Sequence, residues 1–311
     1  MNKEKSAWNG IWDKLKDVTT LAVAAKKLEL DKDCVATLAE AQKKLFADKD
    51  AYTVLKAATV ALMEGDEETL KTQIKAAAEK SGLSWLTAFA ILLINAIPLL
   101  QKVYEDKGYC QELMWDTLID IRCKLREEHD LSGVWGTGAI AWYIRIYRAA
   151  IIKLGRLEFE PIAYKWETPY RHIQKGDPVM NMHIPSTGPM LIEDVLDAFQ
   201  RAYRFFGYKE PMPVMAASWL LYPPVCQLVM KPGSNLRNFY ELFDVVESYE
   251  DPDNKNFWRI FNMEWEEGVL DKVPLDTSLR KNLHAFMKPG VNMGVGRCML
   301  LFDGEKVISL G

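Results

Sequence analysis

Three polar residues suited to proton transfer, Glu158, Glu160 and His183, lie in two short runs in which apolar and polar side chains alternate. The runs are residues 156–164 and 179–184. A period of two is typical of a half-buried strand, and two such runs can pair as a hairpin. His183, which shares a face with Asn181, could then face Glu158 or Glu160. A carboxylate that orients an imidazole in this way makes a general base.

These residues also have ordinary structural explanations, which the sequence leaves open. His183 can be a histidine that is hydrogen-bonded at the end of a strand, as many are. Glu158 and Glu160 share a face by their spacing, and a solvated face explains them as well as a working pair of carboxylates does.

A second set of candidates lies in the stretch Pro211–Asn235. Its apolar run Val214–Tyr222, interrupted only by Ser218, is typical of a strand buried on both faces. The two prolines that follow end this strand and can begin a short helix at once. Folds of the α/β class bind ligands where a central strand turns into a helix. Ser218 can equally bond a neighbouring backbone group, and Tyr222 can be a core phenol or a catalytic acid.

Composition and charge exclude several classes of function. The apolar share of 49% and the charged share of 26% are those of a globular protein. A net charge of −4 and a pI near 5.7 do not indicate the excess of positive charge that is typical of nucleic-acid-binding proteins. The N-terminus has no apolar stretch typical of a secretory signal, so we expect a cytoplasmic protein. The cysteines lack the spacing of a metal site, which predicts free thiols and no metal: Cys34, Cys110, Cys123, Cys226 and Cys298.

Residues 1–153 predict an all-helical domain. Apolar residues recur there at helical spacing, beginning with Trp8 and Trp12, and no alternating run appears. The most apolar segment, Leu83–Leu100, just reaches the length of a membrane span, but polar residues and a proline interrupt it. We therefore expect it to be a buried helix that continues without a break to Asp106, and we expect no membrane span.

Residues 154–311 predict a mixed α/β domain, which makes the fold class α+β. After the alternating hairpin we expect an amphipathic helix over 191–206 and the buried strand over 214–222. The remaining expected elements are helices over 223–230, 235–242, 254–265 and 278–287, a strand over 243–249, and a closing hairpin over 294–310. The glycines of Gly290–Gly296 precede a strand, which favours hairpin geometry.

A string of motifs along the chain resembles a known bacterial family. The motifs are Tyr109–Glu128, Gly155–Glu160, His183-Ile184-Pro185, Ser218–Pro223, Ser234-Asn235-Leu236, Arg259-Ile260-Phe261 and Asp276–Leu279. The family consists of acyltransferases with a helical N-acyltransferase-type N-terminal domain and a C-terminal domain similar to the GNAT (general N-acetyltransferase) fold. The resemblance covers about residues 100 to 300.

This resemblance implies an acyl-CoA-dependent N-acyltransferase with a small-molecule donor and a small-molecule amine acceptor. The resemblance implies His183 as the base, with Glu158 or Glu160 beside it, and Ser218 as a donor to the thioester oxygen. Tyr222 and Tyr249 are the candidate acids. In GNAT folds the pantetheine arm lies between two splayed strands. Mapped here, these strands would be Val214–Tyr222 and Phe243–Tyr249.

The following helix start would then hold the CoA pyrophosphate. The residues that would contact CoA are Trp219, Leu220, Leu221, Pro223, Ser234 and Asn235. The chain departs from the family's usual phosphate loop, because no glycine follows the strand that ends at Tyr222. This departure favours an alternative, a catalytically silent GNAT-like module that binds a ligand or a protein. The sequence specifies neither the acceptor nor the oligomeric state.

Overall fold

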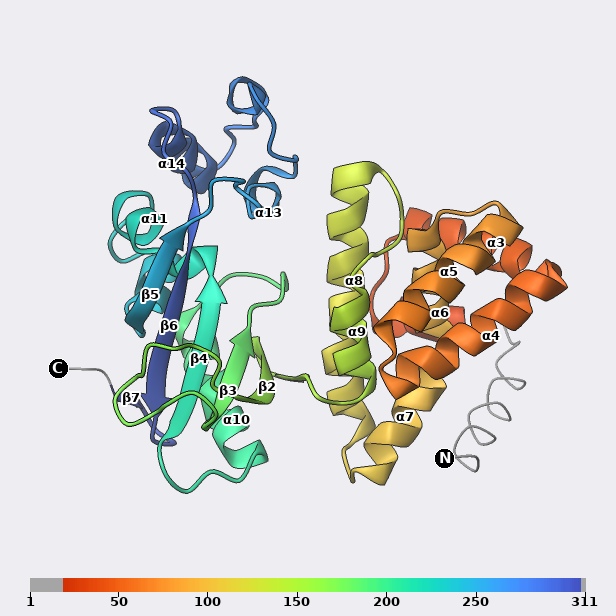
Figure 1. Cartoon of the computed structure of the whole chain (residues 1–311), viewed down its shortest axis with the longest axis horizontal. Helices are drawn as coiled ribbons and strands as arrows, with labels where there is room; N and C mark the ends of the chain where they lie inside the picture. The colour runs from red at the N-terminus through yellow and green to blue at the C-terminus, as the bar shows by residue number, and fades with distance from the viewer. Residues whose placement is uncertain (1–18, 309–311) are drawn as a thin grey trace. The chain divides into compact units, whose positions relative to one another are not determined.

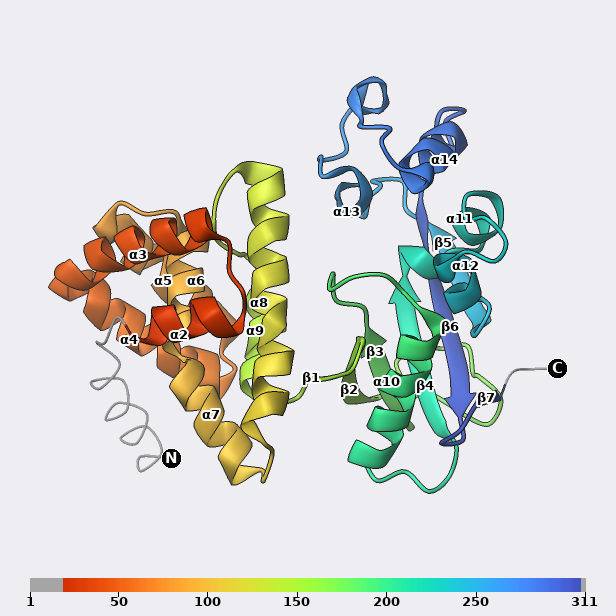
Figure 2. The ribbon, with the colours of Figure 1, turned by 180° about the vertical axis from the view of Figure 1, so that it is seen from behind.

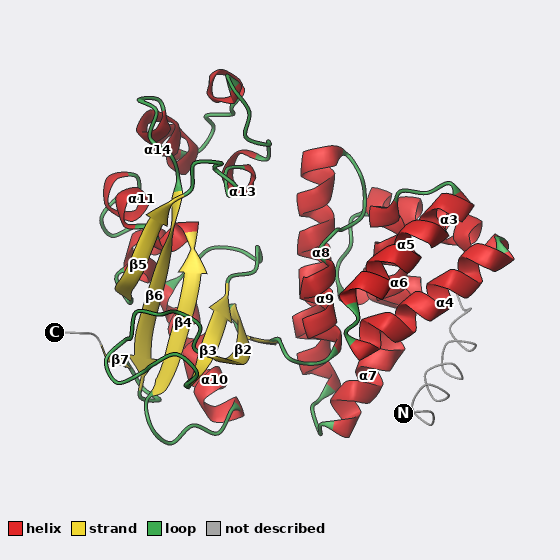
Figure 3. Ribbon diagram, viewed as in Figure 1, coloured by secondary structure: helices red, strands yellow, loops and turns green. Residues whose placement is uncertain are grey.

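The computed structural model describes residues 19–308 of the 311-residue chain. The chain forms two compact units, residues 1–152 and 153–311. The described part of the first unit is helical, whereas a mixed sheet with helices forms the second (Figure 3). The fold is therefore α+β, as the sequence predicts. The expected helix through Trp8 and Trp12 lies outside the described residues.

The helices of the first unit begin and end where the sequence has caps. Asp48 accepts hydrogen bonds from the amides of Asp50 and Ala51, and Asp66 accepts one from Thr69. Gly65 ends a helix with a left-handed φ of 83°. The helices are α2 (Thr19–Lys27), α3 (Lys32–Ala47), α4 (Lys49–Glu64), α5 (Glu67–Ser81), α6 (Trp85–Asn95), α7 (Ile97–Asp106), α8 (Gln111–Ser132) and α9 (Ile140–Tyr147) (Figure 1).

The most apolar segment is two helices rather than the one that the sequence predicts. α6 ends at Asn95 and α7 begins at Ile97, because Pro98 cannot continue the hydrogen-bond ladder of α6 but is tolerated in the first turn of a new helix. Most of α6 is buried. Over residues 19–308 no single helix has the length and apolar character of a membrane span, although α5 and α6, bent by 110°, pass that test as a pair.

The second unit is built on one sheet with the strand order β1-β2-β3-β4-β6-β5, and β7 pairs with β6. The β2–β3 hairpin is antiparallel, β3 and β4 are parallel, and β6 is antiparallel to both β4 and β5. The strands are β1 (Ile152–Leu154), β2 (Leu157–Ala163), β3 (Pro178–His183), β4 (Met212–Ser218), β5 (Asp244–Glu250), β6 (Gly294–Phe302) and β7 (Val307–Ile308).

Different elements cover the two faces of this sheet. Helix α10 (Ile192–Phe205) packs on one face, where Phe199 contacts the rings of Phe159 and Phe302. We call this the α10 face, and Figure 2 shows it. The loop of residues 164–177 covers part of the other face, which we call the loop face (Figure 1). Its aromatic residues form one cluster with sheet residues: Tyr164, Trp166, Tyr170, Ile173, Val179, Met215, Met299 and Leu301.

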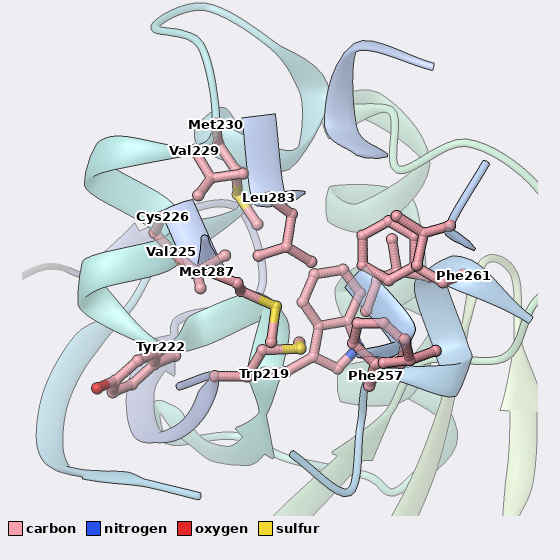
Figure 4. Packing of buried hydrophobic residues seen from close by; sticks show 14 residues of the cluster. Trp219, Tyr222, Val225, Cys226, Val229, Met230, Phe257, Phe261, Leu283 and Met287 are labelled. Atoms are coloured by element: carbon pink, nitrogen blue, oxygen red, sulfur yellow. The ribbon is translucent and has the colours of Figure 1, made fainter. Parts of the chain in front are cut away.

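Another apolar cluster lies where the chain leaves β4. The strand ends at Ser218, earlier than predicted, and Trp219–Leu221 form a 3-10 turn, η1. The predicted helix over 254–265 is much shorter in the structure. The helices that follow η1 are α11 (Pro223–Leu228), α12 (Asn235–Tyr240), α13 (Trp258–Phe261) and α14 (Ser278–Met287), with a 3-10 turn η2 (Val269–Lys272). Their apolar side chains pack around Trp219 (Figure 4).

Candidate active site

The parallel strands β3 and β4 pair at only two positions, in the middle of each strand, and not at their carboxyl ends. Their ladder consists of Met180 opposite Val214 and Asn181 opposite Met215. On its other edge, β4 is paired with β6 over its whole length, from Met212 to Ser218. β3 and β4 therefore part towards their carboxyl ends, and Figure 3 shows their arrowheads diverging. This is the arrangement that admits an extended ligand as an added strand.

The predicted identity of the splayed pair was wrong in one member. The strand of residues 244–250 does not neighbour β4, because β6 lies between them. The partner that parts from β4 is β3, which ends at His183. The mapping from the resemblance made these two strands neighbours, whereas β6, from the end of the chain, inserts between β4 and β5.

Three polar groups meet at the end of β3, on the loop face. His183 Nε2 lies 3.1 Å from Oε2 of Glu160, and Asn181 Nδ2 lies 3.3 Å from the same oxygen. Asn181 Nδ2 and His183 Nε2 are 3.2 Å apart. In the register of the hairpin, Glu160 of β2 lies opposite Asn181 of β3. The contact between Glu160 and His183 is therefore a diagonal one. The structure thus brings together two of the predicted site residues, His183 and Glu160.

Charge determines how the hydrogens of this group are arranged. If Glu160 is ionised, its oxygen accepts, and both nitrogens must donate to avoid a repulsive contact. The Nε2 nitrogen of His183 then carries a hydrogen, and the amide of Asn181 donates to the same carboxylate. The nitrogen of His183 that can accept a proton is then Nδ1. Asn181, which sequence reasoning noted only as a neighbour on the same face, is part of the group.

Glu158, the other predicted carboxylate, lies opposite His183 in the register and is completely buried. The interpretation of Glu158 and Glu160 as a solvated face is therefore wrong, since Glu160 is also only 7% exposed.

Ser218 and Tyr222 lie away from this group. Ser218 is level with Gly296 of β6 and shares the α10 face by alternation, and its hydroxyl accepts a hydrogen bond of 3.2 Å from the amide of Leu220. The ring of Tyr222 lies against Gly294 of β6, beyond β4 as seen from His183. Burial, together with the nearby charge of Glu250, raises the pKa of Tyr222.

Two glycines of β6 allow Leu221 and Tyr222 to pass close to this strand. A Cβ at Gly296 would lie 1.9 Å from the carbonyl oxygen of Leu221, and one at Gly294 would lie 2.6 Å from the ring of Tyr222. Only glycine allows another part of the chain so close to a strand. The predicted hairpin of β6 with β7 forms, but close backbone approach, not the hairpin, explains these two glycines.

The predicted CoA contacts are divided between core and surface. Trp219 is buried in the apolar cluster, with Leu220 packed against it, and Leu221 is also buried. Pro223 begins α11, a helix of six residues, and Ser234 caps α12 by accepting a hydrogen bond from the amide of Arg237. Their assignment took β4 as the first strand of the splayed pair, with α11 as the helix that follows it. In the structure the first strand of the pair is β3, and the helix that follows it is α10. The contact of these residues with CoA stays a prediction.

The loop that follows β3 is held by an arginine that sequence reasoning missed. The guanidinium of Arg156 donates to the carbonyl oxygens of Pro185 (2.8 Å), Gly188 (2.8 Å) and Pro189 (3.0 Å). These three residues belong to the segment between β3 and α10. Arg156 stands in the motif Gly155–Glu160, next to the predicted carboxylates, but nothing in its spacing indicates this contact. Only the fold brings residues about thirty positions apart to one guanidinium.

The thiols of this unit are not suited to covalent catalysis. Burial raises the pKa of Cys226 and of Cys298 to about 12, so both stay protonated near neutral pH. Between residues 19 and 308, no group of three or more His, Cys, Asp or Glu side chains is arranged to hold a metal ion. The chemistry that the geometry offers is proton transfer by His183 at the mouth of two parting strands.

These features define a two-unit protein with a helical unit and an α/β unit, in which two parallel strands part beside a histidine. Residues 19–149 match the N-acyltransferase N-terminal domain, and residues 151–300 match the GNAT-like C-terminal domain. The chain belongs to the family of N-acyltransferases that combine these two domains. No protein with a curated description matches the chain.

Solved structures with the same fold span almost the whole chain. An acyltransferase in complex with decanoyl-CoA and teicoplanin is 18% identical, with a TM-score of 0.72 over 97% of this chain and 96% of that chain. A mutant acyltransferase in complex with octanoyl-CoA is 19% identical, with a TM-score of 0.73 over 96% of this chain and 95% of that chain. At this level of identity, the likeness shows the shared fold.

Proposed function

We propose that this chain is an acyl-CoA-dependent N-acyltransferase, which moves an acyl group from a CoA thioester to the amine of a small molecule. The observation that carries the proposal is the parting of β3 from β4 beside the His183–Glu160 pair. The pantetheine arm would lie between the two strands and pair with their backbones. The similar acyltransferases bind octanoyl-CoA or decanoyl-CoA, which favours a medium-chain donor here.

In the proposed reaction, the neutral amine attacks the thioester carbonyl carbon. A C–N bond forms, and the nitrogen loses a proton to Nδ1 of His183. The tetrahedral intermediate then breaks its C–S bond, and the CoA thiolate leaves and takes up a proton. Glu160 holds the imidazole by its Nε2 hydrogen and stabilises the imidazolium. The Ser218 hydroxyl, at the carboxyl end of β4, is a proposed donor to the carbonyl oxygen. The acid role that the resemblance implies for Tyr222 would require its ring to leave Gly294 of β6 and turn towards the thiolate.

The second candidate is a GNAT-like module that binds a ligand or protein without turnover. The start of α10 favours it, since Glu193 and Asp194 occupy the first turn of the helix and oppose a diphosphate there. The loop before α10 also has a single glycine, Gly188, in place of a glycine-rich phosphate loop.

Thermal unfolding with CoA, octanoyl-CoA and decanoyl-CoA tests the donor. A donor at about 100 times its dissociation constant adds about 2.7 kcal/mol of stability, which appears as a clear rise in the melting temperature. Release of free thiol in the presence of a panel of amines then tests turnover. A shift without turnover favours the silent module, and no shift with any acyl-CoA overturns both the donor and the enzyme.

A further inference from the structure

Ala217 is an exposed residue on a central strand. Two residues earlier on the same face, Met215 is only 4% exposed because the loop of residues 164–177 packs on it. Ala217 belongs to the same face by alternation, yet it is exposed. The cover that the loop provides therefore ends between these two residues. The loop face is open at the carboxyl end of β4, where β3 has parted from it.

The register places one polar side chain on either side of this open position. Ala217 lies directly opposite Arg297 of β6. On the other side, Asn181 is level with Met215, so His183 is level with Ala217 across the parted strands. All three residues belong to the loop face. His183 and Arg297 thus flank a shallow position whose floor is a methyl group.

Arg297 is part of a stack with an exposed aromatic end. Its guanidinium lies 5.8 Å from the ring centroid of Trp166 and 5.2 Å from that of Tyr249. An ion pair of 2.7 Å with Glu247 fixes the guanidinium further. Trp166 is buried, whereas Tyr249 is 46% exposed. A large ring held in place by a cation and still open to solvent is suited to stack on the ring of a ligand.

We propose that the acyl acceptor binds over Ala217, with its primary amine towards His183 and an aromatic group against Tyr249. This inference rests on the proposed function and adds a substrate class to it, namely amines that carry an aromatic ring. Neighbouring strands lie about 4.8 Å apart. Tyr249 belongs to β5, which is three strands away from β3, so the two strands are separated by about 14 Å or more. The amine and the ring of the acceptor must therefore be joined by a linker of several atoms.

Two matched probes test the substrate class. 4-Phenylbutylamine and 4-cyclohexylbutylamine have the same linker and a ring of six carbons, but only the first has a flat aromatic face. With octanoyl-CoA as donor, we expect kcat/KM to favour the phenyl amine by about fivefold, the size of one ring–ring contact. Tyr249→Leu should reduce this ratio to about one. An unchanged ratio in the variant, or no preference in the wild type, would overturn the proposal.

A larger side chain at Ala217 tests whether the acceptor binds over this residue. Ala217→Leu should lower kcat/KM for both amines about tenfold and keep the thermal shift with octanoyl-CoA. Ala163→Leu is the matched control, because Ala163 is an exposed alanine of β2, at the opposite end of the hairpin from His183 and on the other face. Equal behaviour of the two variants contradicts the proposal. So does loss of the octanoyl-CoA shift in Ala217→Leu, since the position would then belong to the donor.

Binding without turnover separates this inference from the proposed function. Saturation-transfer NMR on the whole chain without donor should detect 4-phenylbutylamine, and Ala217→Leu should remove the signal. If the amine binds in this way but no acyl-CoA is used, the proposed function fails while the site stands. If acyl-CoA is used but the signal is the same in wild type and Ala217→Leu, the site fails alone.

Discussion

His183 and Glu160 are joined by a diagonal contact across the β2–β3 hairpin, with Nε2 and Oε2 3.1 Å apart. The residue directly opposite His183 is Glu158, two positions away from Glu160. The diagonal is possible because both side chains lie on the loop face and are long enough to span it. A base held at one nitrogen in this way keeps a fixed orientation towards the space between β3 and β4.

Replacement of His183 should remove most of the activity. His183→Ala leaves the donor site intact but takes away the proton acceptor, and general base catalysis contributes about 100-fold to 10,000-fold. Steady-state kinetics with octanoyl-CoA should show the loss in kcat, with the KM for the donor little changed. His172→Ala, an exposed histidine of the loop, is the control. A loss smaller than about tenfold in His183→Ala places the base elsewhere.

Asn181 should act as a positioning residue for the imidazole. Its Nδ2 lies 3.3 Å from the Glu160 oxygen and 3.2 Å from His183 Nε2, so its loss frees the carboxylate to turn. Long-range ¹H–¹⁵N NMR of the neutral imidazole should show the hydrogen of His183 on Nε2 in the wild type. Asn181→Ala should increase the fraction with the hydrogen on Nδ1, together with a fall in kcat.

The chain has four histidines, so His183→Gln assigns the signal by its disappearance. The tautomer measurement needs no substrate and is independent of turnover. A wild-type imidazole with its hydrogen on Nδ1, or a tautomer that is the same in Asn181→Ala, contradicts the assigned roles.

Arg156 should support the donor through the loop between β3 and α10, because α10 follows the first strand of the parted pair and the proposed function therefore puts the CoA nucleotide beside this loop. Its three hydrogen bonds to carbonyl oxygens hold the segment that leads into the helix start. Arg156→Met should raise the KM for octanoyl-CoA by about tenfold, because a loosened loop costs binding free energy. The KM for octanoyl-pantetheine, which lacks the nucleotide, should stay the same. Equal changes for both donors would show a general structural defect instead.

Arg201→Met serves as the control for loss of an arginine. Its guanidinium makes an exposed ion pair with Asp197 on α10, so its loss should change neither KM. Melting temperatures of both variants show whether the fold is retained.

Patterns within short segments of the sequence predicted the features that residues close together in the chain determine. Alternation identified the β2–β3 hairpin and the shared face of Glu160 and His183. The partner of β4 could not be predicted, since the order of strands depends on contacts between distant parts of the chain. The clamp by Arg156 and the approach of Leu221 to Gly296 depend on the same tertiary arrangement.

Asp120 of α8 should make the stability of the helical unit depend on pH. Asp120 is 1% exposed, and burial raises the pKa of its carboxyl group above the usual 3.8. Lys124 and the N–H of Trp142, which donates to Oδ2 over 2.8 Å, act in the opposite direction and lower this pKa. Because the folded state then holds a proton that the unfolded state releases, the contribution of Asp120 is most favourable below 3.8. It falls as pH rises from 3.8 to the folded pKa, and it is constant above that.

Asp120→Asn keeps an acceptor for the Trp142 N–H and has no proton to lose. Its stability relative to the wild type should therefore increase with pH through the same window and then level off. Urea unfolding followed by tryptophan fluorescence at a series of pH values measures the difference. Asp116→Asn, on the same helix, is the control and should track the wild type. A variant whose stability relative to the wild type does not change with pH would show that Asp120 ionises equally easily in both states.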